Sequence, residues 1–129
     1  MCRFGEVAVK ATCLLISEKV SDPPEAWHSA AQALGCSQSM AVKSCPRSAY
    51  LGLCEEGLVK GVPLARGRWT KSVHNKRYAV SAVHCLRKDP SWLCKPPTRL
   101  WHVVSQSTTK RYNEQIDVVF ALWKARLIT

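Results

Sequence analysis

Acidic residues are scarce in this chain of 129 residues. Nine Asp and Glu stand against nineteen Lys and Arg, so the formal net charge is +10 at pH 7. Long apolar runs are missing as well: no stretch approaches the ~18 consecutive apolar residues of a membrane-spanning helix, and we expect no membrane partner. The first residues lack the uninterrupted apolar segment of a secretory signal peptide, which makes the cytoplasm the expected location.

Close pairs of metal-binding residues are also missing. The seven cysteines contain no C-x-x-C pair and the four histidines contain no H-x-x-x-H pair, so we predict no metal site and no cofactor. Most of the cysteines lie within apolar helical patterns, and their number is odd. These features indicate reduced, partly buried thiols rather than a disulfide scaffold.

The remaining composition is typical of a folded protein. Hydrophobic residues make up 47% of the chain, charged residues 22%, and there are five Trp. The length fits one domain, and no repeat, low-complexity tract or long linker divides it. We therefore predict a single all-α domain over residues 1–129, with about five to seven helices.

Apolar residues recur at helical spacing along most of the chain. The pattern predicts helices over about residues 3–18, 23–34, 46–57, 72–88 (or from 75), 97–105 and 116–127. Residues 36–43 fit either a loop or a short helical turn. Residues 58–68 are the weakest part of the pattern, and a short extended hairpin is an alternative there. The basic residues 64–71 are predicted to form an exposed loop.

The distribution of charge gives the strongest indication of function. Between Gly57 and Asn113 the only acid is Asp89. The densest part of this stretch combines cations with two aromatic rings: Arg66, Arg68, Trp69, Lys71, Lys76, Arg77 and Tyr78. Lys and Arg neutralise phosphates, and Trp and Tyr rings stack on bases, so we predict nucleic acid or another phosphate-rich partner. The alternative is a solvated loop whose Trp69 packs into the core.

A second group of polar residues could form a site. Adjacent helical residues point about 100° apart, so Glu55 and Glu56 should not share a proton, and one of them is expected to face inward and hold a basic group. Asp117 lies among apolar residues and needs a cation or a helix N-terminus as its partner. A small enzyme or ligand binder would use Arg47, Glu55, Glu56 and Asp117.

No residue is assigned a catalytic role. Cys45 precedes Pro46 at a predicted helix start, where a helix N-terminus lowers the pKa of a thiol. A nucleophile also needs a base, and the sequence identifies none beside Cys45. We therefore expect binding rather than catalysis. A protein-interaction or accessory module, including a homodimer formed through an exposed apolar patch, is the second hypothesis.

One block is distinctive enough to compare with known families. It covers residues 45–63 and reads CPRSAYLGLCEEGLVKGVP. Shorter matching segments are FGEVAV at 4–9, NKRYA at 75–79, LW at 100–101 and DVVFALW at 117–123. On these segments the chain resembles a family of small uncharacterised bacterial proteins with no established activity. The resemblance implies one small domain in a bacterial cytoplasm. It would place a site around Pro46, Arg47, Glu55, Glu56 and Lys60, with Asn75 and Asp117.

Overall fold

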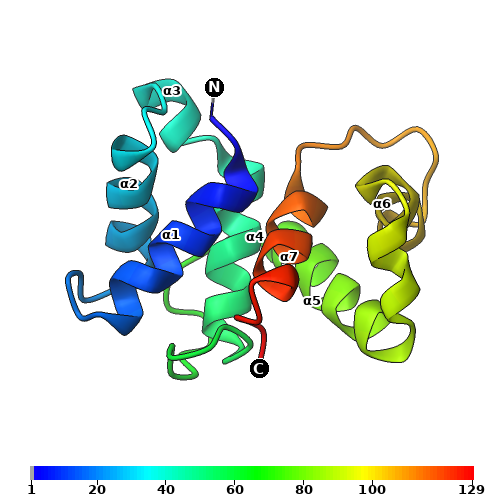
Figure 1. The fold of residues 1–129 in the computed structure, drawn as a ribbon. Coiled ribbons are helices and arrows are strands. Elements are labelled where there is room, and N and C mark those ends of the chain that lie inside the picture. The colour runs from blue at the N-terminus through cyan, green and yellow to red at the C-terminus, as the bar shows by residue number, and fades with distance from the viewer. Residues whose placement is uncertain (1) are drawn as a thin grey trace.

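Helices make up nearly all of the regular structure in the computed structural model, which describes residues 2–129 (Figure 1). The prediction of an all-α fold is confirmed, and the described residues contain no sheet. The elements are α1 (Phe4–Ile16), α2 (Pro23–Ala33), α3 (Gln38–Ala41), α4 (Ser44–Glu55), α5 (Val73–Lys88), the 3-10 helix η1 (Pro90–Cys94), α6 (Pro97–Ser105) and α7 (Gln115–Lys124). None of the helices within residues 2–129 is both long and apolar enough to cross a membrane.

The helices surround two groups of buried aromatic side chains. Figure 1 shows α1 and α2 at one end of the molecule, α5 and α6 at the other, and α4 and α7 between them. Between α1, α2 and α4, the ring of Trp27 stacks on Phe4 at 6.2 Å and lies 5.4 Å from Tyr50. Between α5 and α6, Tyr78 meets Trp101 edge-on at 4.8 Å. These rings contribute a large share of the buried apolar surface that stabilises the fold.

Local sequence explains how several helices begin. Asp22 accepts a hydrogen bond from the N–H of Glu25 at 2.9 Å, and Pro23 occupies the first position of α2, where its missing N–H needs no partner. Residues 36–43, which the sequence left open, contain the short helix α3. Its N-cap is Ser37, whose side chain accepts a backbone hydrogen bond.

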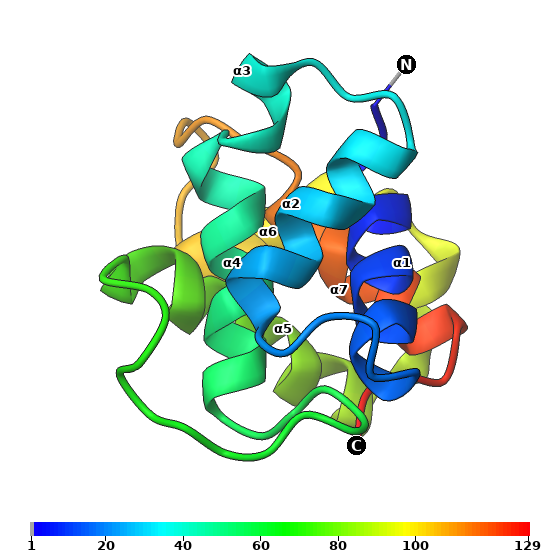
Figure 2. The same cartoon turned by 90° about the vertical axis from the view of Figure 1, so that its left-hand side faces the viewer.

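Residues 58–68 do not form the hairpin considered for them. Val59 instead pairs with Ile128 in one antiparallel bridge, and the N–H of Lys60 donates to the carbonyl of Leu127 at 2.7 Å. The last helix ends earlier than predicted, and the residues that follow it extend beside Val59. Figure 2 shows the remainder of this segment as a wide loop that runs from the end of α4 to the start of α5.

The prediction of reduced thiols is wrong for two of the cysteines. Cys2 and Cys36 form a disulfide across a sequence separation of 34 residues. Because α1 and α2 pack side by side, Cys2, two residues before α1, meets Cys36, three residues after α2, with a Cα–Cα distance of 5.0 Å. The other thiols are free: Cys54 is buried, Cys45 and Cys85 are half-buried, and Cys13 and Cys94 are exposed.

Candidate functional site

A buried carboxylate organises the segment that carries the predicted basic residues. Glu55 is the last residue of α4 and is fully buried. Its Oε2 accepts hydrogen bonds from the N–H groups of Trp69 at 2.5 Å and Thr70 at 2.7 Å, and its Oε1 accepts one from Lys76 Nζ at 2.9 Å. One side chain therefore holds both the loop and the first turn of α5.

Helices α4 and α5 approach each other closely because α4 carries a glycine at their contact. A Cβ atom on Gly52 would lie 2.8 Å from the Cα of Lys76 and 2.7 Å from its Cβ. A larger side chain would force the two helices apart. Gly52 lies about one helical turn before Glu55, so this contact brings Lys76 to the carboxylate. The position also suits a cation, since the C-terminal end of a helix carries partial negative charge.

The surroundings of Glu55 favour its ionised form. Burial alone would raise the pKa of this carboxyl group, but the hydrogen bonds from Lys76, Thr70 and Trp69 outweigh burial and lower the pKa. The expectation that one acid of the Glu55–Glu56 pair faces inward and holds a basic group is confirmed. The inward-facing residue is Glu55.

The second acid of the pair lies at the surface. Glu56 Oε2 lies 3.1 Å from the guanidinium Nε of Arg66 and 3.9 Å from Lys76 Nζ. The Arg66 side chain is 75% exposed, so water competes with this pair and it contributes little to stability. Both acids at the end of α4 are thus paired with cations from the loop and α5.

The structure separates the predicted nucleic-acid-binding residues into two groups. Arg66, Arg68, Lys71 and Arg77 are exposed, and Lys76 is partly buried with its ammonium bonded to Glu55. Trp69 is half-buried against the core, as the alternative prediction proposed, with the Arg68 guanidinium 5.9 Å from its ring centre.

Tyr78 belongs to the interior rather than to the surface. It is 5% exposed and packs against Trp101, so its ring offers little area on which a base could stack. Lys110 Nζ donates to its hydroxyl group at 2.9 Å and lies 5.5 Å from its ring centre, and the Arg77 guanidinium lies 5.7 Å away. Lys110 is exposed and was not among the predicted site residues. Its position in the acid-poor stretch was the only signal for it.

The predicted group of Arg47, Glu55, Glu56 and Asp117 does not converge. Arg47 lies in the first turn of α4, about 12 Å along the helix from Glu55 at 1.5 Å per residue. Asp117 lies in the first turn of α7, where its N–H donates to Tyr112 Oη at 2.8 Å. Burial is the main cause that raises the pKa of Asp117, opposed by the Tyr112 hydroxyl.

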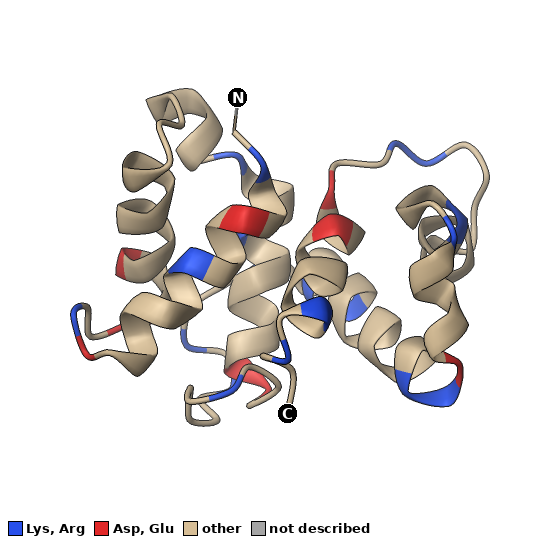
Figure 3. Ribbon diagram, viewed as in Figure 1, with Lys and Arg blue, Asp and Glu red and all other residues tan. Residues whose placement is uncertain are grey.

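Asp117 instead lines a cavity of about 550 Å³, together with Glu6 and Glu114. Figure 3 shows the acidic segment of α1 beside the acidic start of α7. Within residues 2–129, no three His, Cys, Asp or Glu side chains are arranged to hold a metal ion.

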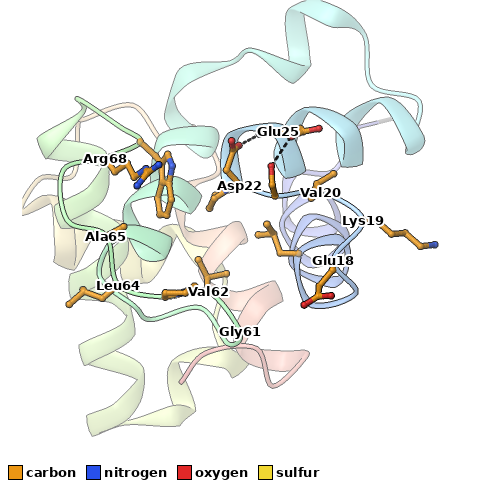
Figure 4. Close-up of a pocket in the computed structure, with 15 residues that line it drawn as sticks. Glu18, Lys19, Val20, Asp22, Glu25, Gly61, Val62, Leu64, Ala65 and Arg68 are labelled. Atoms are coloured by element: carbon orange, nitrogen blue, oxygen red, sulfur yellow. Dashed lines mark hydrogen bonds between the residues drawn. The ribbon is translucent and has the colours of Figure 1, made fainter.

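A second cavity borders the basic loop. It measures about 740 Å³ and lies between the α1–α2 connection and residues 61–69. In Figure 4, Arg68 lies on one side of this cavity, while Asp22 and Glu25 lie on the other. Trp69 also lines it, together with apolar residues that include Val20 and Val62.

Comparison with known proteins identifies the family. The family model described as "Family of unknown function (DUF6979)" matches residues 1–129. The chain belongs to this family. No curated protein and no solved structure matches it. The resemblance to an uncharacterised family is therefore confirmed, and family membership assigns no activity to this DUF6979 protein.

In this DUF6979 protein, exposed cations lie beside acids that already have partners. Glu55 is engaged by three donors, and Glu56 is paired with Arg66. The neighbouring cations Arg68 and Lys71 face solvent. The two acids at the end of α4 are therefore already occupied by partners from the loop and α5.

Proposed function

We propose that this protein binds nucleic acid through a basic surface made of Arg66, Arg68, Lys71, Arg77 and Lys110. One observation carries the proposal. Among the described residues, every ion pair involves Glu55 or Glu56, so Arg68, Lys71, Arg77 and Lys110 have no acidic partner. Each of these cations is exposed and available to a phosphate group.

The physical basis is the release of counterions from the phosphate backbone. Each Lys or Arg that neutralises a phosphate displaces condensed cations, which favours binding at low salt. The hydrogen bonds from Trp69 and Thr70 to Glu55 hold the loop in place before any partner arrives. Less conformational freedom is therefore lost on binding than for an unanchored basic segment.

The proposal is tested by fluorescence anisotropy with a labelled single-stranded DNA at low salt. The triple variant Arg68→Ser/Lys71→Ser/Arg77→Ser is expected to bind on the order of tenfold more weakly than the wild type. The matched control, Lys88→Ser/Lys95→Ser/Arg99→Ser, removes the same charge from other exposed positions. It should lose clearly less affinity. Absence of binding by the wild type, or equal losses in both variants, would overturn the proposal.

A protein-interaction role is the second candidate. It is supported by large apolar side chains at the surface, of which Val73 is 71% exposed and Leu64 57% exposed. Burial of such side chains against a partner or a second copy would be favourable. Light scattering across a concentration series tests the homodimer. An apparent mass that rises with concentration is expected if the protein self-associates. A monomer at every concentration would rule out the homodimer.

We also propose the bacterial cytoplasm as the working location. The free thiols, including exposed Cys13 and Cys94, suit a reducing compartment. The Cys2–Cys36 disulfide is the observation that opposes this location. Cell fractionation tests it: recovery with cytoplasmic markers is expected, and recovery from the envelope or the medium would contradict it.

A further inference from the structure

The cavity beside the basic surface has one wall built around an aromatic ring. Its volume of about 740 Å³ lies within the usual range for small-molecule sites. Trp69 lines this wall, and its backbone N–H is fixed by Glu55 at 2.5 Å. The Arg68 guanidinium lies over this ring, 5.9 Å from the ring centre. The wall therefore combines an aromatic ring with a positive charge.

The opposite wall offers hydrogen-bond acceptors. Asp22 and Glu25 project from the start of α2 and lie across the cavity from Arg68 (Figure 4). Asp22 Oδ1 accepts the N–H of Glu25, and Glu25 Oε2 lies 3.4 Å from Ser21 Oγ. Neither carboxylate is in an ion pair among the described residues. An ionised carboxylate has four lone-pair positions, so both groups retain accepting capacity.

These two walls select the chemistry of a ligand. A planar ring would stack on Trp69, a phosphate would meet Arg68, and the edge of the ring facing Asp22 and Glu25 would need N–H donors. Among the bases, guanine presents two adjacent donors on its Watson–Crick edge, N1–H and the 2-amino group. Thymine and uracil place carbonyl oxygens on both sides of one N–H, and adenine and cytosine place an acceptor nitrogen beside their amino group. Carboxylates repel such acceptors.

We infer that this cavity binds a single unpaired guanine of a bound strand. The inference rests on the proposed nucleic-acid function, because the phosphates on either side of the guanine would occupy the basic surface. Apolar residues such as Val20 and Val62 line the cavity and would exclude water from the ring. A base that makes this bidentate contact to a carboxylate should bind on the order of tenfold more tightly than a base that lacks it.

The test compares two labelled strands of equal length and charge. One is oligo(dT) of about 12 nucleotides, and the other carries one central guanine in place of a thymine. Equal charge keeps the phosphate contribution constant. The wild type is expected to bind the guanine strand about tenfold more tightly. The variant Asp22→Asn/Glu25→Gln should bind the two strands with equal affinity, even if the loss of two negative charges raises its affinity for both. Asn caps helices as well as Asp does, so α2 should remain intact.

A control variant separates the cavity from general acidity. Glu6→Gln/Asp117→Asn removes two carboxylates from the other acidic cavity and should keep the guanine preference. Equal wild-type affinity for both strands overturns the guanine inference and leaves the proposed function standing. If neither strand binds, the proposed function is wrong. The cavity is then tested alone by calorimetry with guanosine monophosphate, and the absence of saturable binding overturns the inference too.

Discussion

Glu55 and Lys76 lie 21 residues apart in the sequence, and their side chains meet at 2.9 Å between Oε1 and Nζ. The carboxylate is fully buried, whereas the Lys76 side chain is 22% exposed. The same carboxylate also accepts the two backbone N–H groups that order the basic loop. The end of α4, the loop and the start of α5 are therefore held together at a single side chain.

Loss of the Glu55 charge should destabilise the fold. Glu55→Gln weakens the charge-assisted hydrogen bonds that this side chain accepts from Lys76, Trp69 and Thr70, so it is expected to lower the free energy of unfolding by about 3 kcal/mol. Glu56→Gln is the matched control. Its exposed pair with Arg66 should contribute at most about 0.5 kcal/mol. Urea unfolding followed by circular dichroism measures both, and equal losses would show that the buried pair has no special role.

The same residue predicts a dependence of stability on pH. The pKa of Glu55 is lowered in the folded protein relative to its ordinary value of 4.5. A carboxyl group with a lowered pKa makes its full contribution to folding stability above the pKa that it has in the unfolded chain. That contribution is lost as the pH falls through the pKa that the group has in the folded protein. The stability difference between the wild type and Glu55→Gln should therefore be constant near neutral pH and shrink below about pH 4.5. A difference that persists or grows in acid contradicts this.

The close contact at Gly52 should be coupled to the ion pair. Gly52→Ala places a methyl group 2.8 Å from the Lys76 Cα and is expected to destabilise by about 1–3 kcal/mol. Because the shift would also move Lys76 away from Glu55, the double variant Gly52→Ala/Glu55→Gln should lose less than the sum of the single losses. Strictly additive losses in urea unfolding would show that the two contacts act independently.

Much of the fold follows from local sequence signals. Helical periodicity and the Asp22–Pro23 start signal act within a few residues, and they predicted the six longer helices. The Val59–Ile128 bridge and the Cys2–Cys36 disulfide were missed. Both join segments that only the packed helices bring together, so no local pattern reports them.

The candidate site was predictable in part. The scarcity of acids identified the basic stretch, and helical geometry indicated that one of Glu55 and Glu56 faces inward. The burial of Tyr78 and the approach of Lys110 to its hydroxyl depend on how α6 and the following loop pack on α5. A side chain's exposure is a property of the assembled fold, so charge and aromaticity alone placed Tyr78 wrongly at the surface.

The disulfide should contribute to stability through the unfolded chain. A disulfide that joins residues 34 positions apart lowers the entropy of the unfolded chain. Its contribution to the free energy of unfolding is expected to be at most about 3–4 kcal/mol. Cys2→Ser/Cys36→Ser should be less stable than the wild type and indifferent to a dithiol reductant, whereas the reductant should destabilise the wild type. Thermal unfolding measures this. A wild type whose unfolding midpoint ignores the reductant would contradict it.

The salt dependence of binding tests the basic surface most directly. The logarithm of the association constant for single-stranded DNA is plotted against the logarithm of salt concentration for the wild type and for Arg68→Ser/Lys71→Ser/Arg77→Ser. Each lost phosphate contact should lower the magnitude of the slope by about 0.7, so the variant's slope should be smaller by about 2. Identical slopes for the two proteins would contradict the proposal that these side chains neutralise phosphates.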